Sequence, residues 1–353
     1  MREPTKPSAG VSNDSAVTGE SALDPATSWA ADPPPEAGPG SVWVTGQVGS
    51  REQRRGRYTR ESMAHPGKML PSIARYAIAT YSRIGEWVLD PMAGIGTTVV
   101  EAMHLGRRGI GVEYEPRWAE LAAGNLRHAT TQGATGTGQI FTGDSRYLPA
   151  LVPAEARGRV SLVLTSPPYG SSTHGHVRSP GPRRGKVRKI HHQYGADAAN
   201  LAYQEHDELA AGFTEILTGC AAILRPGGHV VVTARPYRRH GELVDIPGMV
   251  VAAGQNAGLR PYERCVALIA GIRDGRLIAR PSFFQLKNLR AAIAAGDPQW
   301  LVQHEDILVF QTPDTADGPN SSDVEPAEDS GPDARTSAPR IGRAGNGASG
   351  GAA

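Results

Sequence analysis

The chain has 353 residues, of which 20% are charged, 39% hydrophobic and only 6% aromatic. Residues 1–40 contain seven prolines, residues 313–353 are rich in glycine, alanine and serine, and each segment carries a net charge of −4. Because such segments cannot bury enough apolar area to offset the entropy of ordering them, we expect two disordered tails around one sizeable hydrophobic core formed by residues 41–312. That core carries a net charge of +10, which favours a polyanionic partner over ordinary surface basicity.

Composition excludes several classes of protein. Cys220 and Cys265 are the only cysteines, so the chain has neither a disulfide framework nor a cysteine zinc cluster. The N-terminus lacks the apolar stretch of a signal peptide, and no run approaches the ~18 apolar residues of a membrane-spanning helix. No repeat of fixed period is present. We therefore expect a soluble, cytoplasmic protein.

Alternating strand and helix patterns begin near His65. Buried-strand patterns cover residues 86–90, 109–113, 139–141, 160–164, 228–233, 264–271 and 305–310. Helical patterns cover the residues after Pro71 and residues 97–105, 116–128, 208–224 and 242–257. This alternation implies right-handed crossovers and a mostly parallel sheet, with an antiparallel edge from the last two strands. Ligands bind beyond the carboxyl ends of the strands in such sheets, and the distinctive motifs of this chain lie there.

A glycine-rich turn and two acidic residues follow the first three predicted strands. Gly94 and Gly96 allow the backbone to turn sharply and to approach a ligand. Glu113, nineteen residues after Gly94, can accept hydrogen bonds from both hydroxyls of a ribose, and Asp144 can accept one from an adenine amino group. A dinucleotide site would need a third glycine where Val99 stands, so the turn favours S-adenosylmethionine. The simpler alternative is that the glycines only form a turn and Glu113 only caps a helix.

The segment Ser166-Pro167-Pro168-Tyr169 follows the fourth strand and is the most specific motif in the chain. The amino group of a nucleobase is a poor nucleophile because its lone pair is delocalised into the ring, and acceptors that hold both hydrogens favour a pyramidal, reactive nitrogen. The Ser166 hydroxyl and the Pro167 carbonyl can be these acceptors, since proline has a rigid backbone and no competing N–H. Tyr169 can stack on a base rotated out of its helix. These four are the candidate catalytic residues; a Pro-Pro turn beside a core tyrosine is the alternative.

The motifs resemble those of the exocyclic-amino nucleic-acid methyltransferases, the N-4/N-6 DNA methylase family. The resemblance rests on residues 65–71, 90–98, 166–169, 224–228 and 304–310, with Met92 and Ile95 where the family usually has phenylalanine and serine. It implies a Rossmann-like S-adenosylmethionine-dependent methyltransferase fold of the α/β class, with a mostly parallel seven-stranded sheet and helices on both faces. It also implies that S-adenosyl-L-methionine is bound by Asp90, Pro91, Ala93, Gly94, Gly96, Thr97, Glu113 and Asp144.

The resemblance further implies methyl transfer to an exocyclic amino nitrogen of a base in DNA. Serine before Pro-Pro is more typical of cytosine-N4 enzymes, and adenine N6 is the other target. The chain is also similar to the tRNA guanine-N2 methyltransferases, but residues 41–64 are too short for the RNA-binding domain that such enzymes commonly carry. A third interpretation is a non-catalytic nucleic-acid-binding protein on a methylase scaffold, against which the intact Asp90, Glu113, Asp144 and Ser166 argue.

A basic insertion, residues 171–205, follows the Pro-Pro motif. Long irregular loops are usually functional or disordered, and basic side chains beside an active site can neutralise the phosphates around a rotated base. The candidate nucleic-acid-binding residues are Arg178, Arg183, Arg184, Lys186, Arg188 and Lys189. A solvated mobile loop is the alternative. Between Gly170 and Leu201 the histidines have no cysteine and only one acidic residue, Asp197, beside them, so we expect no metal site. Residues 51–60 and 235–240 form two further basic clusters, the first of which could follow a nucleic-acid backbone.

Overall fold

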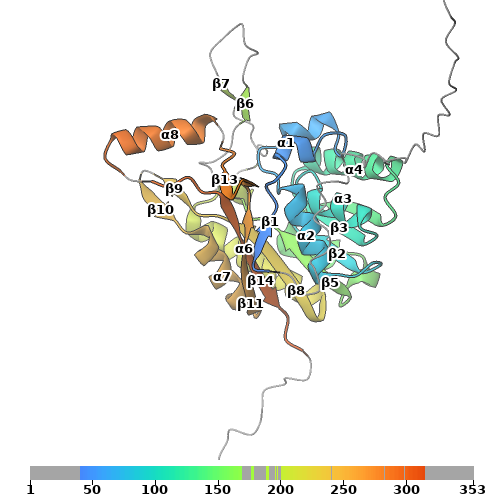
Figure 1. The fold of residues 1–353 in the computed structure, drawn as a ribbon. Coiled ribbons are helices and arrows are strands. Elements are labelled where there is room, and N and C mark those ends of the chain that lie inside the picture. The colour runs from blue at the N-terminus through green and yellow to red at the C-terminus, as the bar shows by residue number, and fades with distance from the viewer. Residues whose placement is uncertain are drawn as a thin grey trace, which may run out of the picture. The chain divides into compact units, whose positions relative to one another are not determined.

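An eight-stranded sheet runs through the part of the chain that the computed structural model describes (Figure 1). The described residues are 40–168, 176–178, 188–190, 195, 197, 200–239, 241–281, 283–297 and 299–314. In spatial order the strands are β1 (Val42–Val44), β11 (Arg260–Leu268), β14 (His304–Gln311), β8 (Leu224–Ala234), β5 (Val160–Thr165), β2 (Trp87–Asp90), β3 (Arg108–Glu113) and β4 (Thr137–Thr142). Strand β14 runs antiparallel to both of its neighbours, and every other pair in this sheet is parallel.

The prediction of a mostly parallel α/β sheet is confirmed, but the expected count of seven strands is one too few. The additional strand, β1, pairs in parallel with β11 at the edge of the sheet. Its central residue, Trp43, is buried and stacks on Tyr76 with 4.4 Å between ring centroids. Three residues are too few to show an alternating pattern, so only the pairing and the packing of Trp43 reveal the strand.

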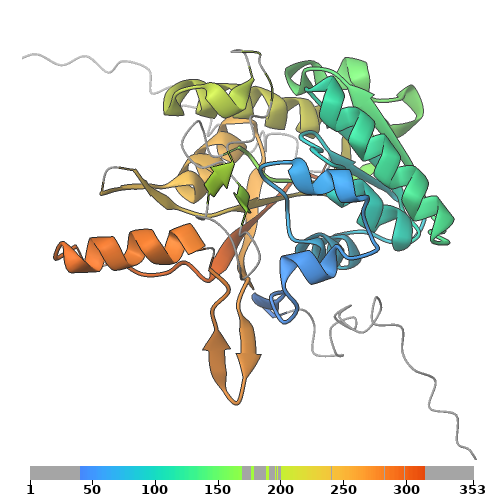
Figure 2. The ribbon, with the colours of Figure 1, turned by 90° about the horizontal axis from the view of Figure 1, so that it is seen from above.

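Helices cover both faces of the sheet (Figure 2). One face carries α2 (Pro71–Tyr81), α3 (Thr97–His104) and α4 (Pro116–Thr131), and the other carries α5 (Leu148–Leu151), α6 (His206–Ile223) and α7 (Ile246–Asn256). Pro71 and Pro116 occupy the first turns of α2 and α4, where the missing N–H leaves no hydrogen bond unmade.

Neighbouring residues of the central strands point alternately into two cores. Val88 of β2 packs with residues of α2, whereas Leu89 packs with residues of α6 and α7. In β5, Leu162 and Leu164 join the first core and Val163 joins the second. A parallel sheet with helices on both faces buries the side chains of both sides, which is why these strands appear in the sequence as unbroken apolar runs.

Several elements outside the central sheet were not expected from the sequence. They are the antiparallel pairs β6 (His176–Arg178) with β7 (Arg188–Ile190), β9 (Tyr237–Arg239) with β10 (Glu242–Val244) and β12 (Gly271–Arg273) with β13 (Arg276–Ile278), and the helix α8 (Phe283–Ala294). The first pair lies within the insertion that we expected to be an irregular loop. Short helical turns complete this part of the chain: α1 (Ser50–Gln53), η1 (Arg60–Ala64), η2 (Ser145–Tyr147), η3 (Ala154–Ala156) and η4 (Leu201–Tyr203).

Arg54 of the basic cluster 51–60 is buried and Arg57 is partly buried with its side chain only 12% exposed, which corrects the expectation that the whole cluster follows a nucleic-acid backbone. Arg57 donates hydrogen bonds of 3.1 and 2.6 Å to the Glu101 carboxylate, and the Tyr58 hydroxyl donates one of 2.7 Å. Arg54 is 3% exposed and donates to two main-chain carbonyls. The two arginines therefore hold the segment before α2 in place, because a buried charge is tolerated only with bonded partners.

The predicted tails fall almost wholly outside the described residues, so their disorder stays a prediction. Within the described residues, no helix combines the length and the apolarity that crossing a bilayer requires.

Candidate functional site

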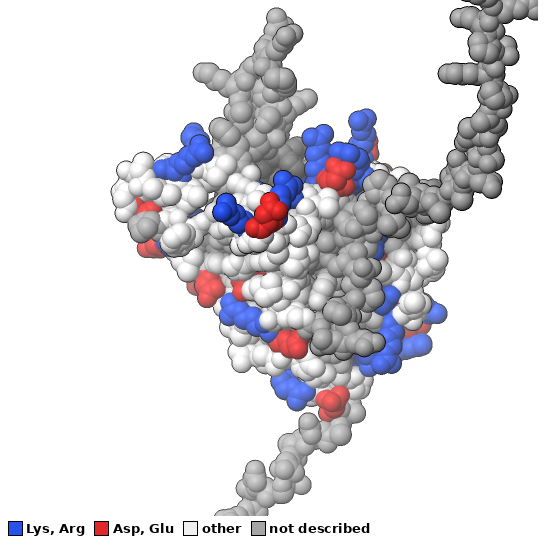
Figure 3. All heavy atoms as spheres, viewed as in Figure 1, with Lys and Arg blue, Asp and Glu red and all other residues white. Residues whose placement is uncertain are grey.

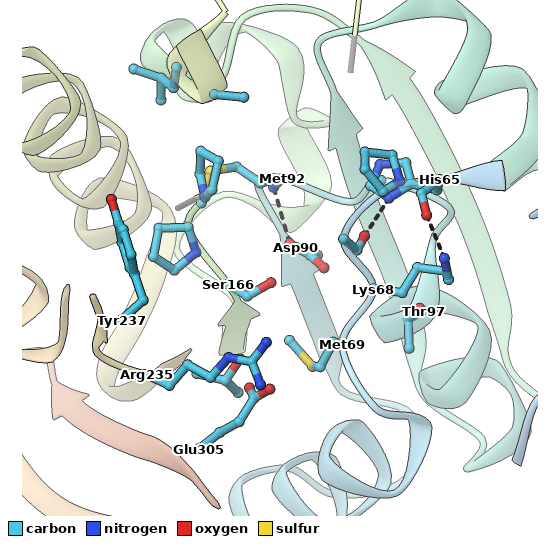
Figure 4. A pocket seen from close by; sticks show the side chains of 18 of the residues that line it. His65, Lys68, Met69, Asp90, Met92, Thr97, Ser166, Arg235, Tyr237 and Glu305 are labelled. Atoms are coloured by element: carbon cyan, nitrogen blue, oxygen red, sulfur yellow. Dashed lines mark hydrogen bonds between the residues drawn. The ribbon is translucent and has the colours of Figure 1, made fainter. Parts of the chain in front are cut away.

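A pocket of about 890 Å³ lies at the carboxyl ends of the parallel strands β2, β3, β5 and β8 (Figure 4). Its lining comes from the turns after these strands, from the segment before α2, and from α8 with the residues that follow it. The volume suits a small organic ligand, and the position is the one expected for an open α/β sheet. The candidate residues that line it are Asp90, Pro91, Ala93, Gly94, Thr97, Glu113, Asp144, Ser166, Pro167 and Pro168.

Asp90 ends β2 and holds the glycine turn in shape. Its carboxylate accepts hydrogen bonds from the Met92 amide at 3.0 Å, the Thr98 hydroxyl at 2.7 Å and the Thr165 hydroxyl at 2.8 Å. Burial raises the pKa of Asp90 to about 6, although these three hydrogen bonds act to lower it. Because Thr98 lies in the first turn of α3 and Thr165 ends β5, the carboxylate ties the turn to the strand that leads into Ser166.

Gly94 and Gly96 both have left-handed backbone conformations, with φ of +55° and +78°. A Cβ on Gly94 would lie 3.1 Å from the His65 ring, so glycine lets the turn pass close to that side chain. A Cβ on Gly96 would lie 3.3 Å from the Cβ of Ala122 in α4, and Gly96 is not part of the pocket lining. Gly94 therefore faces the pocket, whereas Gly96 allows α4 to approach the start of α3.

Glu113 ends β3 with its carboxylate among the lining groups. One carboxylate oxygen accepts the Gly94 amide at 2.7 Å, and the other accepts the Glu115 amide at 2.9 Å. Burial is the main cause that raises the pKa of Glu113 to about 7, and the charges of Asp90 and Glu115 add to it. Each oxygen keeps a second lone pair, which can accept a hydrogen bond from a ligand hydroxyl.

Asp144 also lines the pocket, but Arg146 already engages its carboxylate. The Arg146 guanidinium donates to both oxygens, at 2.6 Å over the shortest contact, and the Arg146 amide donates at 3.0 Å. Burial alone would raise the pKa of Asp144, but the hydrogen bonds from Arg146 outweigh it and hold the pKa below its usual value. A ligand amine at this position would therefore share the carboxylate with Arg146, a competitor that the sequence analysis overlooked although it stands two residues away.

The Ser166-Pro167-Pro168 segment follows β5 and lines the same pocket as the glycine turn. Figure 4 shows the Ser166 side chain pointing into the space that Asp90 and Arg235 also border. Tyr169, the fourth candidate catalytic residue, lies outside the described residues.

The segment before α2 supplies two lining side chains that we had not placed among the site residues. The His65 ring hydrogen-bonds with the Gly67 carbonyl and packs edge-on against Trp118, with 4.7 Å between ring centroids. The Lys68 ammonium donates to the carbonyls of His65 and Met63. Burial lowers the pKa of Lys68 to about 7, with a smaller contribution from a nearby arginine. The signal was available, because both residues belong to a segment on which the family resemblance rests.

The remaining wall comes from the last third of the described chain. Arg235 and Tyr237 follow β8, Glu305 lies in β14, and Trp300 lies between α8 and β14. Arg235 could have been found from the rule that strand ends carry site residues, since it directly follows β8. Trp300 stands in no periodic pattern, so only the structure brings it to the pocket.

The predicted nucleic-acid-binding residues are not tested by this structure. Arg183, Arg184 and Lys186 lie outside the described residues, while Arg178 belongs to β6 and Arg188 and Lys189 belong to β7. In the described ranges, no three side chains of His, Cys, Asp or Glu are grouped in a way that could hold a metal ion.

Comparison with protein families agrees with the resemblance seen in the motifs. Residues 22–124 match the family model described as DNA methylase. This match covers less than a third of the chain; it includes the glycine turn and Glu113 and ends before Asp144 and Ser166. The resemblance to this family is therefore confirmed over that part of the sequence.

The curated relatives include tRNA (guanine(10)-N2)-dimethyltransferases and Type II methyltransferases. The chain is 30% identical over 128 residues to the tRNA (guanine(10)-N2)-dimethyltransferase of Methanocaldococcus jannaschii, which is 36% of this chain and 33% of that protein. It is 33% identical over 69 residues to the Type II methyltransferase M2.LlaDCHI of Lactococcus lactis subsp. cremoris, which is 20% of this chain and 26% of that protein. The chain thus spans about a third or less of the curated relatives it matches, and both families that the motifs suggested are represented.

Solved structures with a similar arrangement include TrmN from Thermus thermophilus, with a TM-score of 0.41 and 17% identity over 74% of this chain and 53% of that one. Precorrin 8w decarboxylase from Methanobacterium thermoautotrophicum has a TM-score of 0.43 and 13% identity over 74% of this chain and 98% of that one. At these scores the fold assignment rests on the sheet topology described above.

Proposed function

We propose that the chain is an S-adenosylmethionine-dependent methyltransferase that modifies an exocyclic amino nitrogen of a nucleobase in DNA, with cytosine N4 as the favoured target. The observation that carries the proposal is that Ser166, Pro167 and Pro168 line the same pocket as the glycine turn and Glu113. A turn suited to a nucleoside donor and a motif suited to an amine acceptor belong in one cavity, because methyl transfer requires the two reactants to meet in a fixed orientation.

The pocket residues fit S-adenosylmethionine as the cofactor. Glu113 has a free lone pair on each oxygen for ribose hydroxyls, and Gly94 leaves the turn open where a Cβ would crowd the His65 ring. Asp144 adds an acceptor that an adenine amine would share with Arg146. Bound in this pocket, S-adenosylmethionine would supply an electrophilic methyl group.

In the proposed reaction, the chain activates and positions the amine. The Ser166 hydroxyl and the Pro167 carbonyl each accept a hydrogen bond from one N–H of the amine. These two hydrogen bonds favour a pyramidal nitrogen with an available lone pair. The hydrogen bond from Thr165 to Asp90 limits the movement of the adjoining Ser166 relative to the glycine turn. Such preorganised positioning and electrostatics supply most of the rate in this type of transfer.

Two observations favour DNA as the substrate: the description of the matching family model as DNA methylase, and serine before Pro-Pro. A second candidate, methylation of guanine N2 in tRNA, is favoured by the 128-residue match to the tRNA enzyme of Methanocaldococcus jannaschii. Both candidates use the same kind of amine, so the pocket geometry supports them equally.

The deciding experiment incubates the purified protein with methyl-labelled S-adenosylmethionine and either DNA or tRNA, followed by mass spectrometry of the nucleosides. We expect N4-methylcytosine from DNA. Labelled guanosine from tRNA with unlabelled DNA would establish the second candidate instead. Cofactor binding without label in either nucleic acid would support the non-catalytic interpretation.

The role of Ser166 has a separate test. Ser166→Ala should lower kcat about 100-fold, because one of the two acceptors that polarise the amine is lost, while the affinity for S-adenosylmethionine stays unchanged. The matched control is Ser50→Ala, which removes an exposed hydroxyl in α1 and should leave kcat unaltered. Equal loss of cofactor affinity and kcat in Ser166→Ala would contradict a role in holding the amine.

A further inference from the structure

Trp300 is an almost fully exposed tryptophan in the lining of the pocket. It is 92% exposed, whereas Trp43, Trp87 and Trp118 are all buried. An indole is one of the largest apolar surfaces that a side chain can bury, and leaving it in water forgoes that stabilisation. A tryptophan kept in solvent beside a ligand pocket therefore points to a flat, apolar binding partner that is absent from the isolated chain.

The residues around Trp300 supply polar groups of a particular kind. Asn288 of α8 and Gln299 line the same wall, and the Gln299 amide donates to the Asp297 carboxylate. Carboxamides can donate and accept at once, which suits the edge of a nucleobase. An aromatic face with carboxamides beside it matches the two surfaces of a base, its ring face and its hydrogen-bonding edge.

Exposed positive charge lies on α8, which contributes to this wall, and on the β12–β13 hairpin. Figure 3 shows Lys and Arg side chains over α8, over the β12–β13 hairpin and over α1. Lys287 and Arg290 of α8 and Arg273 and Arg276 of the hairpin are exposed. Exposed basic side chains beside an exposed aromatic ring are the combination with which proteins bind single-stranded nucleic acid, the cations for phosphates and the ring for bases.

We propose that Trp300 stacks on a nucleobase of the substrate DNA strand at the mouth of the pocket, next to the base that is methylated, while α8 contacts the phosphates beside it. This inference rests on the proposed function and adds a recognition residue to it. The stacked base differs from the target base, which Ser166 and the Pro-Pro segment hold at the end of β5. Stacking of this kind depends little on which base is stacked. Trp300 therefore increases the affinity for the strand and fixes its position along the pocket, but it does not select a particular base.

The test uses tryptophan fluorescence, because Trp300 is the exposed tryptophan among the described residues. The full-length protein carries Trp29→Phe in every variant, since Trp29 lies outside the described residues and would add its own emission. The probes are a short single-stranded DNA of mixed sequence and the corresponding duplex, each added in the presence of S-adenosylhomocysteine. We expect the single strand to quench the Trp300 emission and Trp300→Phe to abolish that quenching while it keeps most of the affinity.

Trp300→Ala should weaken binding of the DNA probe about tenfold, because the aromatic face is lost. The matched control is Ile293→Ala, which removes an exposed apolar side chain of α8 outside the pocket lining and should leave the affinity unchanged. Affinity for S-adenosylhomocysteine, measured by calorimetry, should be the same in all variants.

Two results would overturn the inference, and each can be distinguished from failure of the proposed function. DNA binding and methyl transfer that are equally strong in Trp300→Ala and in the parent protein would remove Trp300 from recognition and leave the enzyme assignment intact. A Trp300 emission already shifted to the blue without DNA, together with a dimer in sedimentation, would mean that a second copy of the chain covers the ring. If the parent protein neither binds DNA nor transfers methyl groups, the proposed function fails first and the stacking proposal falls with it.

Discussion

At the scale of single residues, three buried carboxylates show how the neighbouring groups determine whether a carboxylate is ionised at neutral pH. Among the described residues, Asp90 and Glu113 accept hydrogen bonds from hydroxyls and main-chain amides alone, and burial raises their pKa to about 6 and about 7. Glu101 is fully buried, and burial would raise its pKa too, but the adjacent charges of Arg57 and Arg75 outweigh that effect and lower it. Asp90 and Glu113 therefore respond to pH near neutrality, whereas Glu101 stays ionised and structural.

Cofactor binding should depend on the ionisation of Glu113. Ribose hydroxyls donate hydrogen bonds, so the ionised carboxylate binds better, and affinity should rise about tenfold from about pH 6 to about pH 8 as Glu113 loses its proton with a pKa of about 7. The free energy of unfolding changes with pH in the opposite direction. Because the pKa of Glu113 is raised from 4.5 in the folded protein, its contribution to stability is present at low pH and is lost as the pH rises through about 7. Calorimetric titration with S-adenosylhomocysteine across this range measures the first effect.

The Glu113→Gln variant should bind S-adenosylhomocysteine weakly, and its affinity should not rise with pH. The control is Glu155→Gln, which changes an exposed carboxylate and should behave like the parent protein. A parent affinity that does not change with pH would show that the carboxylate does not contact the ribose.

Glu101 gives a prediction about stability. Glu101→Gln removes the negative charge that pairs with Arg57 at 2.6 Å and Arg75 at 3.4 Å, and leaves two cations in or near the interior. We expect a loss of about 3 kcal/mol in the free energy of unfolding, measured with urea. The exposed Glu120→Gln is the control and should change it by less than about 0.5 kcal/mol. A small effect of Glu101→Gln would mean that the arginines find water or other acceptors.

At the scale of elements, the close approach of β3 to the cofactor turn depends on missing side chains. A Cβ on Gly111 of β3 would lie 2.8 Å from the Cβ of Ala93 in the turn and 2.7 Å from Ile140 in β4. These contacts are too short for ordinary packing, so glycine at this position sets how near the turn can lie to the sheet. The strand thereby helps to shape the pocket, although Gly111 itself does not line it.

Gly111→Ala should therefore cost about 1–3 kcal/mol of stability and weaken cofactor binding, because Ala93 and its turn must move. Gly124→Ala in α4 is the matched control, since its Cβ would meet nothing closer than 3.8 Å. A helix interior favours alanine, so this control should stabilise the protein by about 0.5–1 kcal/mol. Thermal unfolding and calorimetry with S-adenosylhomocysteine measure both effects. Unchanged cofactor affinity in Gly111→Ala would show that the position of the turn does not depend on the missing side chain in β3.

At the scale of the whole molecule, charge is divided along the chain. Residues 41–312 carry a net charge of +10 and each flanking segment carries −4. Within the described residues, α8 contributes to the pocket lining and carries exposed basic side chains, and further basic side chains lie over the β12–β13 hairpin (Figure 3). Association with a polyanion should therefore be strongly salt-dependent, because each phosphate contact releases counterions.

The salt dependence separates charge from stacking. Removing both charges of α8 with Lys287→Gln and Arg290→Gln should reduce the slope of log affinity against log salt by about 2, at nearly one per phosphate contact. Trp300→Ala should lower the affinity without a change of slope. Arg159→Gln, an exposed charge at the opposite end of β5, is the control and should alter neither quantity. Fluorescence anisotropy with labelled DNA over a range of salt concentrations provides the slopes.

The sequence by itself determined the parallel α/β core, the strand-end placement of Asp90, Glu113, Asp144 and Ser166, and the resemblance to the methylases. These features are local, because apolar runs, glycine turns and strand ends each depend on residues that are adjacent in the sequence. Only the tertiary structure decided that β14 inserts between β8 and β11, that Arg57 pairs with Glu101 instead of facing solvent, and that α8 brings Trp300 to the pocket. Each of these depends on contacts between segments far apart in the chain, whose energies no local pattern contains.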